Sequence, residues 1–153
     1  MTSIALALHA LAAVVWVGGM FTIYVCLRPA LPTLDRAPDR LSIAAATFGK
    51  FFPWVWMSII VLFGTGYLML FTSQGGFAFA GMHVHIMQGV AWLMAILFGW
   101  LYWGPWGDLR DAVAAGNWEQ AAGDLARIRR VIAINLPLGL IVVAIGASGR
   151  WWA

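Results

Sequence analysis

Charge is scarce in this chain of 153 residues: Asp, Glu, Lys and Arg together make up 10% of it, against about 25% in an ordinary soluble domain. Hydrophobic residues make up 63%. A soluble fold of this length cannot bury so much apolar surface and would expose large apolar patches. The composition therefore predicts a membrane protein. Because a helix needs about 20 apolar residues to cross about 30 Å of hydrocarbon, the length allows four spans and no separate soluble domain.

Cysteine is nearly absent as well. The single thiol, Cys26, excludes an intrachain disulfide and a metal site built from several cysteines. The sequence also lacks a Walker loop, a glycine-rich dinucleotide turn and a Ser/His/Asp set, and its apolar stretches contain no Asp or Glu. These absences argue against the common soluble enzymes, and against an acid-dependent proton relay or an ion channel.

Four apolar stretches are long enough to cross a bilayer, at about residues 4–27, 51–71, 84–106 and 131–147. The first has no basic segment before it and is too long for the apolar part of a signal peptide, so we expect it to be retained. Helices are expected because a backbone in lipid must satisfy its own hydrogen bonds, and long unbroken apolar runs are not typical of barrel strands. The predicted fold is an all-α membrane protein, a four-transmembrane-helix bundle that forms a single domain over residues 1–153.

Basic residues are confined to two connections. Eight of the nine Lys and Arg residues lie in residues 28–50 and 107–130, only Arg150 lies elsewhere, and residues 72–81 carry no charge. Because Lys and Arg accumulate in cytoplasmic loops, these two connections are predicted in the cytoplasm and both termini on the non-cytoplasmic side. The net charge of +3 thus reflects membrane topology. The lipid bilayer is the expected partner and nucleic acid is not; a homo-oligomer is left open.

The stretch from Trp118 to Arg130 is polar but has a helical pattern. Ala121, Leu125 and Ile128 recur on one stripe. We therefore expect it to extend the fourth helix into the cytoplasm.

All three histidines are predicted at one depth. His9 lies near the outer end of the first span, and His83 and His85 lie at the outer start of the third. Ionisable side chains within spans are costly and usually face a bundle interior or a cavity. Imidazole is the commonest metal ligand and a routine axial ligand of haem. A metal or haem site near the outer face is one interpretation, and histidines that only form interior hydrogen bonds are the other.

The spacing of His83 and His85 limits how both can act. A helix points residues two apart to nearly opposite sides, whereas an extended segment points them the same way and lets both bind one ion. Within a helix only one of them joins His9, and His85 is the better candidate because Gln88 follows on its face. His83 is followed by Met87, a softer face that suits Cu(I) or simply lipid.

Other side chains are expected around such a site. Trp16 lies in line with His9, and Gly19 allows close approach of a neighbouring helix or a flat ring. Tyr67 comes from the outer half of the second span. Arg150 is the only cation predicted on the outer side, either as a partner for an anionic group such as a haem propionate or as an interface anchor.

Several of these residues carry a resemblance to a known family. The chain resembles the CopD family of bacterial inner-membrane proteins in Leu8-His9-Ala10-Leu11, Val15-Trp16-Val17-Gly18-Gly19-Met20, Leu27-Arg28-Pro29-Ala30-Leu31, Thr65-Gly66-Tyr67 and Ile128-Arg129-Arg130. The likeness covers most of the chain. It implies a small multi-pass helical protein of the bacterial inner (cytoplasmic) membrane with a role in copper uptake or tolerance.

The first helix is also similar to that of the membrane-bound, haem-binding protoporphyrinogen oxidases, in which a first-helix histidine followed by a Trp and a Gly matters. His9, Trp16 and Gly19 match that pattern. The lysine that follows the third-helix histidine in that family has no counterpart, since Met87 and Gln88 stand near its place. This departure argues against the oxidase activity.

Three hypotheses follow, and whether the protein is an enzyme, such as a membrane oxidoreductase, is left open. The leading one is electron transfer or oxidoreduction by a b-type haem or another His-ligated metal, with a quinone or a periplasmic redox protein as electron partner and with His9, His85, Trp16, Gly19, Tyr67, Gln88 and Arg150 around the cofactor. The second is copper uptake, delivery or resistance, with a periplasmic copper protein as partner and with His9, His83, His85, Met82 and Met87 as ligands. The third is a non-catalytic membrane subunit.

Overall fold

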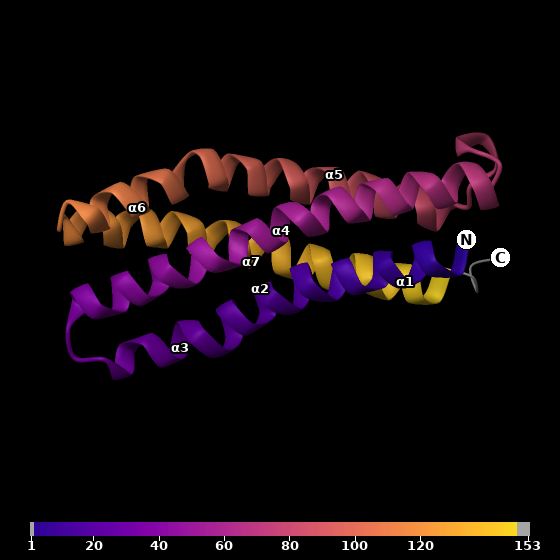
Figure 1. The fold of residues 1–153 in the computed structure, drawn as a ribbon. Coiled ribbons are helices and arrows are strands. Elements are labelled where there is room, and N and C mark those ends of the chain that lie inside the picture. Colours follow the sequence, from indigo (N-terminus) through magenta and orange to yellow (C-terminus); the bar gives the residue numbers. More distant parts are fainter. Residues whose placement is uncertain (1, 150–153) are drawn as a thin grey trace.

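The computed structural model describes residues 2–149 and confirms the predicted all-α class. Within these residues there is no strand, and four long antiparallel rods of helix lie side by side (Figure 1). All four are long and apolar enough to cross a membrane. The first rod consists of α1 (Thr2–Ala13), η1 (Val14–Gly18), α2 (Gly19–Phe21), η2 (Thr22–Leu27), α3 (Arg28–Ala30) and η3 (Leu31–Thr33). The others are α4 (Ala37–Ser73), α5 (Met82–Trp103) with α6 (Pro105–Ala114), and α7 (Trp118–Ser148), while a short η4 (Phe77–Phe79) lies between α4 and α5.

The two charged connections, residues 28–50 and 107–130, are mostly helical, whereas the sequence predicted a helix there only from Trp118 to Arg130. Only residues 34–36 and 115–117 separate the rods at this end. The second turn is closed by Gly116, which has a positive φ of 69°, and by Asn117, whose side chain accepts a hydrogen bond from the backbone N–H of Gln120 at 3.2 Å. The helices extend past the predicted spans because their charged turns still have a buried apolar stripe.

That stripe is clearest at the start of α7. Ala121, Leu125 and Ile128 are buried there, as the sequence predicted for an extension of the fourth helix. They pack with Leu109 and Ala112 of α6, which are also buried. The extension of the fourth helix is therefore confirmed.

The first rod contains two π-helical segments, η1 and η2. The hydroxyl of Thr22 donates to the carbonyl of Gly18 at 2.9 Å between them. Trp16, Met20 and Ile23 are nevertheless buried on one side of the rod. Single π turns within α-helices are frequent at functional sites, and η2 lies where the first rod borders a cavity described below.

We name two halves of the bundle. The arginine-rich half comprises residues 16–59 and 94–139, and the terminal half comprises residues 2–15, 60–93 and 140–149, so that α1 begins and α7 ends at the same end of the molecule (Figure 1). Nearly the whole buried core lies in the arginine-rich half. In the described part of the terminal half, only Ala5, Ala12 and Leu70 are fully buried hydrophobic side chains.

Aromatic rings hold the arginine-rich half together. The ring of Phe52, 2% exposed, lies 5.2 Å from that of Phe48, 5.4 Å from that of Phe98 and 5.3 Å from that of Trp106. Elsewhere the helices associate mainly as two pairs, α1 with α4 and α5 with α7. The pairs meet through the aromatic cluster, so the terminal half is joined by fewer contacts.

Candidate functional site

The candidate residues on α1, α4 and α5 fall into three groups in the terminal half. The first group is built on His9 of α1. Its Nδ1 lies 2.9 Å from the hydroxyl oxygen of Thr65 on α4, and that hydroxyl donates to the carbonyl of Val61 at 2.6 Å. Because a threonine hydroxyl has a single proton, Nδ1 must be the donor to Thr65, which leaves Nε2 of His9 as the nitrogen with a lone pair. Metal-ligating histidines are usually oriented by such a second hydrogen bond.

The ring of His9 packs against α4 at Gly66. A Cβ atom at this glycine would lie 3.4 Å from Cε1 of His9. The ring thus packs closely on the backbone of α4, and His9 is half-buried between α1 and α4. This group is a positioned imidazole at the interface of one helix pair.

The second group joins α4 to α5. The hydroxyl oxygen of Tyr67 accepts hydrogen bonds from Nε2 of Gln88 at 2.8 Å and from Nε1 of Trp92 at 3.2 Å. The ring of Phe63 stacks next to Trp92, with centroids 4.6 Å apart. The structure therefore brings together Tyr67 and Gln88, two residues that the sequence placed in one site. The hydrogen bond to Tyr67 explains the presence of a polar Gln88 within a span.

The third group lies on the opposite face of α5, against α7. Both His83 and His85 belong to the first turn of α5, so they point to different sides. A Cβ atom at Gly149, the residue after α7, would overlap the ring of His83, and one at Gly146 would lie 3.0 Å from Cε of Met87 and 3.6 Å from its sulfur. His83 and Met87, one helical turn apart, thus share a face that packs on glycines.

His85 has a different environment from the one the sequence favoured. The expectation was that His85 is the inward histidine, but it is exposed, with its ring stacked 6.5 Å from that of Phe77 in η4, whereas His83 is half-buried. The reason is that α5 packs more closely on α7 than on α4. His85 as a ligand stays a prediction. Met82 begins the helix and is 70% exposed.

Trp16 and Gly19 belong to the arginine-rich half. The indole of Trp16 is buried and its ring packs edge-on against Phe98 at 6.4 Å. A Cβ atom at Gly19 would overlap the ring of Phe51, so this glycine does allow the close approach of a flat ring from a neighbouring helix. Arg150 lies outside the described residues.

The three histidines predicted at one depth do not form one cluster. Across residues 2–149 there is no group of three or more His, Cys, Asp or Glu side chains that could hold a metal ion. Gly149 and Gly146, which face His83 and Met87, were not singled out from the sequence. The enrichment of small residues at helix interfaces in membranes is a signal that could have found Gly146 within the fourth span.

A known family matches the part of the chain that holds most of these residues. The model of the CopD family, described as copper resistance protein D, matches residues 45–148, about two thirds of the chain. The chain belongs to the CopD family. No curated protein and no solved structure matches it. As a CopD protein with four apolar helices, it is a multi-pass protein of the inner membrane related to copper resistance.

The region matched to CopD includes Thr65, Tyr67, His83, His85 and Met87, and it leaves out the first rod with His9. The resemblance in the sequence depends largely on that first rod, and the match adds support from residues 45–148, of which the resemblance used only Thr65-Gly66-Tyr67 and Ile128-Arg129-Arg130. The similarity to the haem-binding oxidases is not shown. The groups present offer an imidazole–thioether pair and a separate positioned imidazole, both of which are donors for soft or borderline metals.

Proposed function

We propose that this CopD protein binds Cu(I) as its cargo between α5 and α7 in the terminal half, and that it thereby serves copper uptake, delivery or resistance. The observation that carries the proposal is the shared face of His83 and Met87. Thioether sulfur and imidazole nitrogen are the donor types that suit Cu(I), and residues four apart in a helix lie side by side. Both residues lie within the stretch that matches the copper-resistance family.

The α5–α7 interface continues this face toward the middle of the bundle. Met94 is buried on it, and a Cβ atom at Gly139 would lie 3.1 Å from Cε of Met94. Met87 faces Gly146 and Met94 faces Gly139, so the same methionine–glycine contact recurs after seven residues on both helices. From His83 to Met94 the soft side chains extend along about 16 Å of helix at 1.5 Å per residue. We propose this row as the path of the ion.

The packing of the terminal half supports a transient cargo rather than a resident ion. Few side chains there are fully buried, and movement of helices is easiest where buried apolar contacts are few. A copper ion that must leave again needs donors that become accessible when helices separate, and here both donors come from α5 and are covered by α7. Two helices that meet through glycines and flexible methionine side chains fit that need.

The test is Cu(I) affinity of the purified protein in detergent under reducing conditions, measured by competition with a chromophoric chelator. We expect Met87→Leu and His83→Ala to weaken binding by at least about tenfold, since loss of even an outer-shell partner costs 10–100-fold in metal affinity. Met57→Leu is the matched control, because Met57 is 57% exposed on α4. Wild-type affinity in both the Met87 and His83 variants would contradict the proposal.

A second candidate function keeps the haem hypothesis, in which His9 is an axial ligand. One observation favours it. Nδ1 of His9 donates a hydrogen bond to the hydroxyl of Thr65, and Nε2 of His9 therefore has a lone pair that could ligate iron. The absorption spectrum of the same preparation decides between them. A Soret band with α and β bands on reduction, lost in His9→Ala, supports haem, whereas stoichiometric copper in a colourless reduced sample supports the copper proposal.

A further inference from the structure

A cavity at the arginine-rich end is not used by the proposed function. It has a volume of about 570 Å³ and lies between the end of the first rod, the start of α4 and the first half of α7. Four of its lining residues are Tyr24, Arg28, Arg40 and Arg129, and none of its lining residues is acidic. The π-helical η2 carries Tyr24 to the cavity wall, and Arg28 follows directly after it. Three guanidinium groups therefore border one space without a carboxylate among them.

Two arginines of this cavity, Arg28 and Arg40, are held in place by neutral groups. The guanidinium of Arg28 lies over the ring of Tyr24, 4.8 Å from its centroid. Arg40 donates from Nε to the carbonyl of Leu34 at 2.9 Å and from Nη2 to the backbone carbonyl of Asp35 at 3.0 Å. Arg129 is half-buried and close enough to Arg28 for their like charges to repel.

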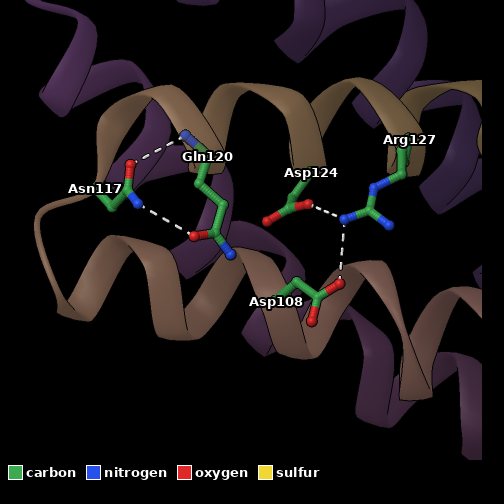
Figure 2. A network of polar contacts seen from close by, with 5 residues as sticks. All are labelled: Asp108, Asn117, Gln120, Asp124 and Arg127. Carbon is green, nitrogen blue, oxygen red and sulfur yellow. Dashed lines mark hydrogen bonds and ion pairs between the residues drawn. The ribbon is translucent and has the colours of Figure 1, made fainter.

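Arg127, on the same helix as Arg129, is neutralised by carboxylates. Arg127 pairs with Asp108 of α6 at 3.1 Å and with Asp124 of α7 (Figure 2). Among residues 2–149, neither Arg28 nor Arg129 has a carboxylate within 4.0 Å. Clustered cations without a counter-charge destabilise a fold, so this end of the bundle has a positive charge that an anion would balance.

The rest of the cavity wall is apolar. Leu31, Leu41 and Leu125 line it together with the arginines. A ligand that fits has an anionic group for the arginines and an apolar part for these leucines. Arginine is the residue of choice for phosphate because its planar guanidinium donates two parallel hydrogen bonds. The connections on this end are the ones predicted in the cytoplasm, which places the cavity at the depth of lipid headgroups.

We propose that this cavity is a phosphate-binding site, with Arg28 and Arg129 as the principal donors and Arg40 and Tyr24 as further polar contacts. The apolar wall favours the phosphate of an anionic phospholipid over a free one. Such a site would fix lipid between α7 and the first rod with α4, and the last two are joined there by a turn of only three residues, 34–36. The inference is independent of copper binding, which we place at the other end of the bundle.

The experiment compares thermal unfolding in detergent of the wild type, Arg28→Gln/Arg129→Gln and the matched control Arg110→Gln/Arg130→Gln. The control removes the same charge from exposed arginines of the same end. Each protein is measured with added phosphatidylglycerol, with zwitterionic phosphatidylcholine and with inorganic phosphate. We expect phosphatidylglycerol to raise the Tm of the wild type and of the control, and the concentration needed to rise about tenfold or more in the double variant.

The outcomes separate the sources of the phosphate. A shift with phosphatidylglycerol alone supports a lipid, and a shift that inorganic phosphate reproduces supports a soluble phosphate compound; both must depend on Arg28 and Arg129. The inference fails if the double variant responds as the control does, or if neither compound shifts the wild type. A Tm without added lipid equal to that of the control shows that the double variant is folded, so that a lost lipid response is not a folding defect.

Discussion

The two halves of the bundle differ in what fills the space between the helices. In the arginine-rich half, aromatic rings and branched aliphatic side chains interdigitate around Phe52, and the charged ends of α6 and α7 are tied by Arg127. In the terminal half, the helices are joined by side-chain hydrogen bonds to Thr65 and Tyr67 and by contacts on glycines. The arginine-rich half is thus tightly packed, whereas in the terminal half His83 and Met87 stay partly exposed.

This division fits a protein that must release what it binds. Between membrane helices, close van der Waals packing supplies much of the association energy, and segments with few packed side chains open most easily. The polar groups of the terminal half lie where such opening costs least. We expect substitutions to lower stability in the arginine-rich half and to alter ligand binding in the terminal half.

The largest expected effect comes from the centre of the aromatic cluster. Phe52→Ala removes a ring that contacts five others, and the cavity left behind should cost about 3–5 kcal/mol of unfolding free energy. Phe71→Ala is the control in the terminal half, where the same ring is 60% exposed and should cost little. Denaturant titration in mixed micelles measures both. Equal losses in the two variants would remove the distinction between the halves.

A smaller loss of stability is expected at Gly139, where three helices meet. A Cβ atom at Gly139 would lie 2.8 Å from Cγ2 of Val17 and 3.1 Å from Cε of Met94, so Gly139→Ala should cost about 1–3 kcal/mol by overpacking. Gly64→Ala is the control, since nothing lies within 4 Å of a Cβ there. It should be neutral, or stabilising by up to about 1 kcal/mol, because alanine favours a helix. A stable Gly139→Ala protein would show that α7 is not tightly packed there.

The sequence predicted the class and number of helices because both follow from composition and run length, which need no partner. It also predicted the helical start of α7 from the stripe of Ala121, Leu125 and Ile128, and it placed Tyr67 and Gln88 together. The side of the membrane on which the termini lie stays a prediction from the arginine distribution.

The inward and outward faces of α5 were harder to predict, because they depend on which neighbouring helix α5 packs against. The sequence predicts His85 and Gln88 on one inward face, but α5 turns Met87 toward Gly146 of α7 and His83 toward Gly149. Periodicity groups residues on faces without naming the neighbour of each face. Only the contacts of α5 with α4 and α7 could decide that.

Tyr67→Phe tests whether hydrogen bonds, rather than packing, join α4 to α5 in the terminal half. It removes one acceptor that serves both Gln88 and Trp92, and should cost about 0.5–1.5 kcal/mol. Hydrogen exchange should rise in residues 60–73 and 82–93 and stay unchanged in the arginine-rich half. Tyr102→Phe is the control, because the described contacts of Tyr102 are ring contacts. Unchanged exchange in Tyr67→Phe would mean that the ring of Tyr67 alone holds the two helices.

The smallest effect on stability, and the sharpest test of the terminal half as a binding region, is expected for Thr65→Val. The substitution keeps the shape of the side chain and removes the acceptor for Nδ1 of His9, at a cost of about 1 kcal/mol or less. If His9 ligates a metal or a haem through Nε2, affinity should fall 10–100-fold, because the orienting hydrogen bond is lost. If copper binds only at His83 and Met87, Cu(I) affinity stays at the wild-type value, since both lie on the face of α5 that packs on α7. One variant, measured by Cu(I) competition and by absorption spectrum, thus decides whether the imidazole on α1 belongs to the same site as the soft donors on α5.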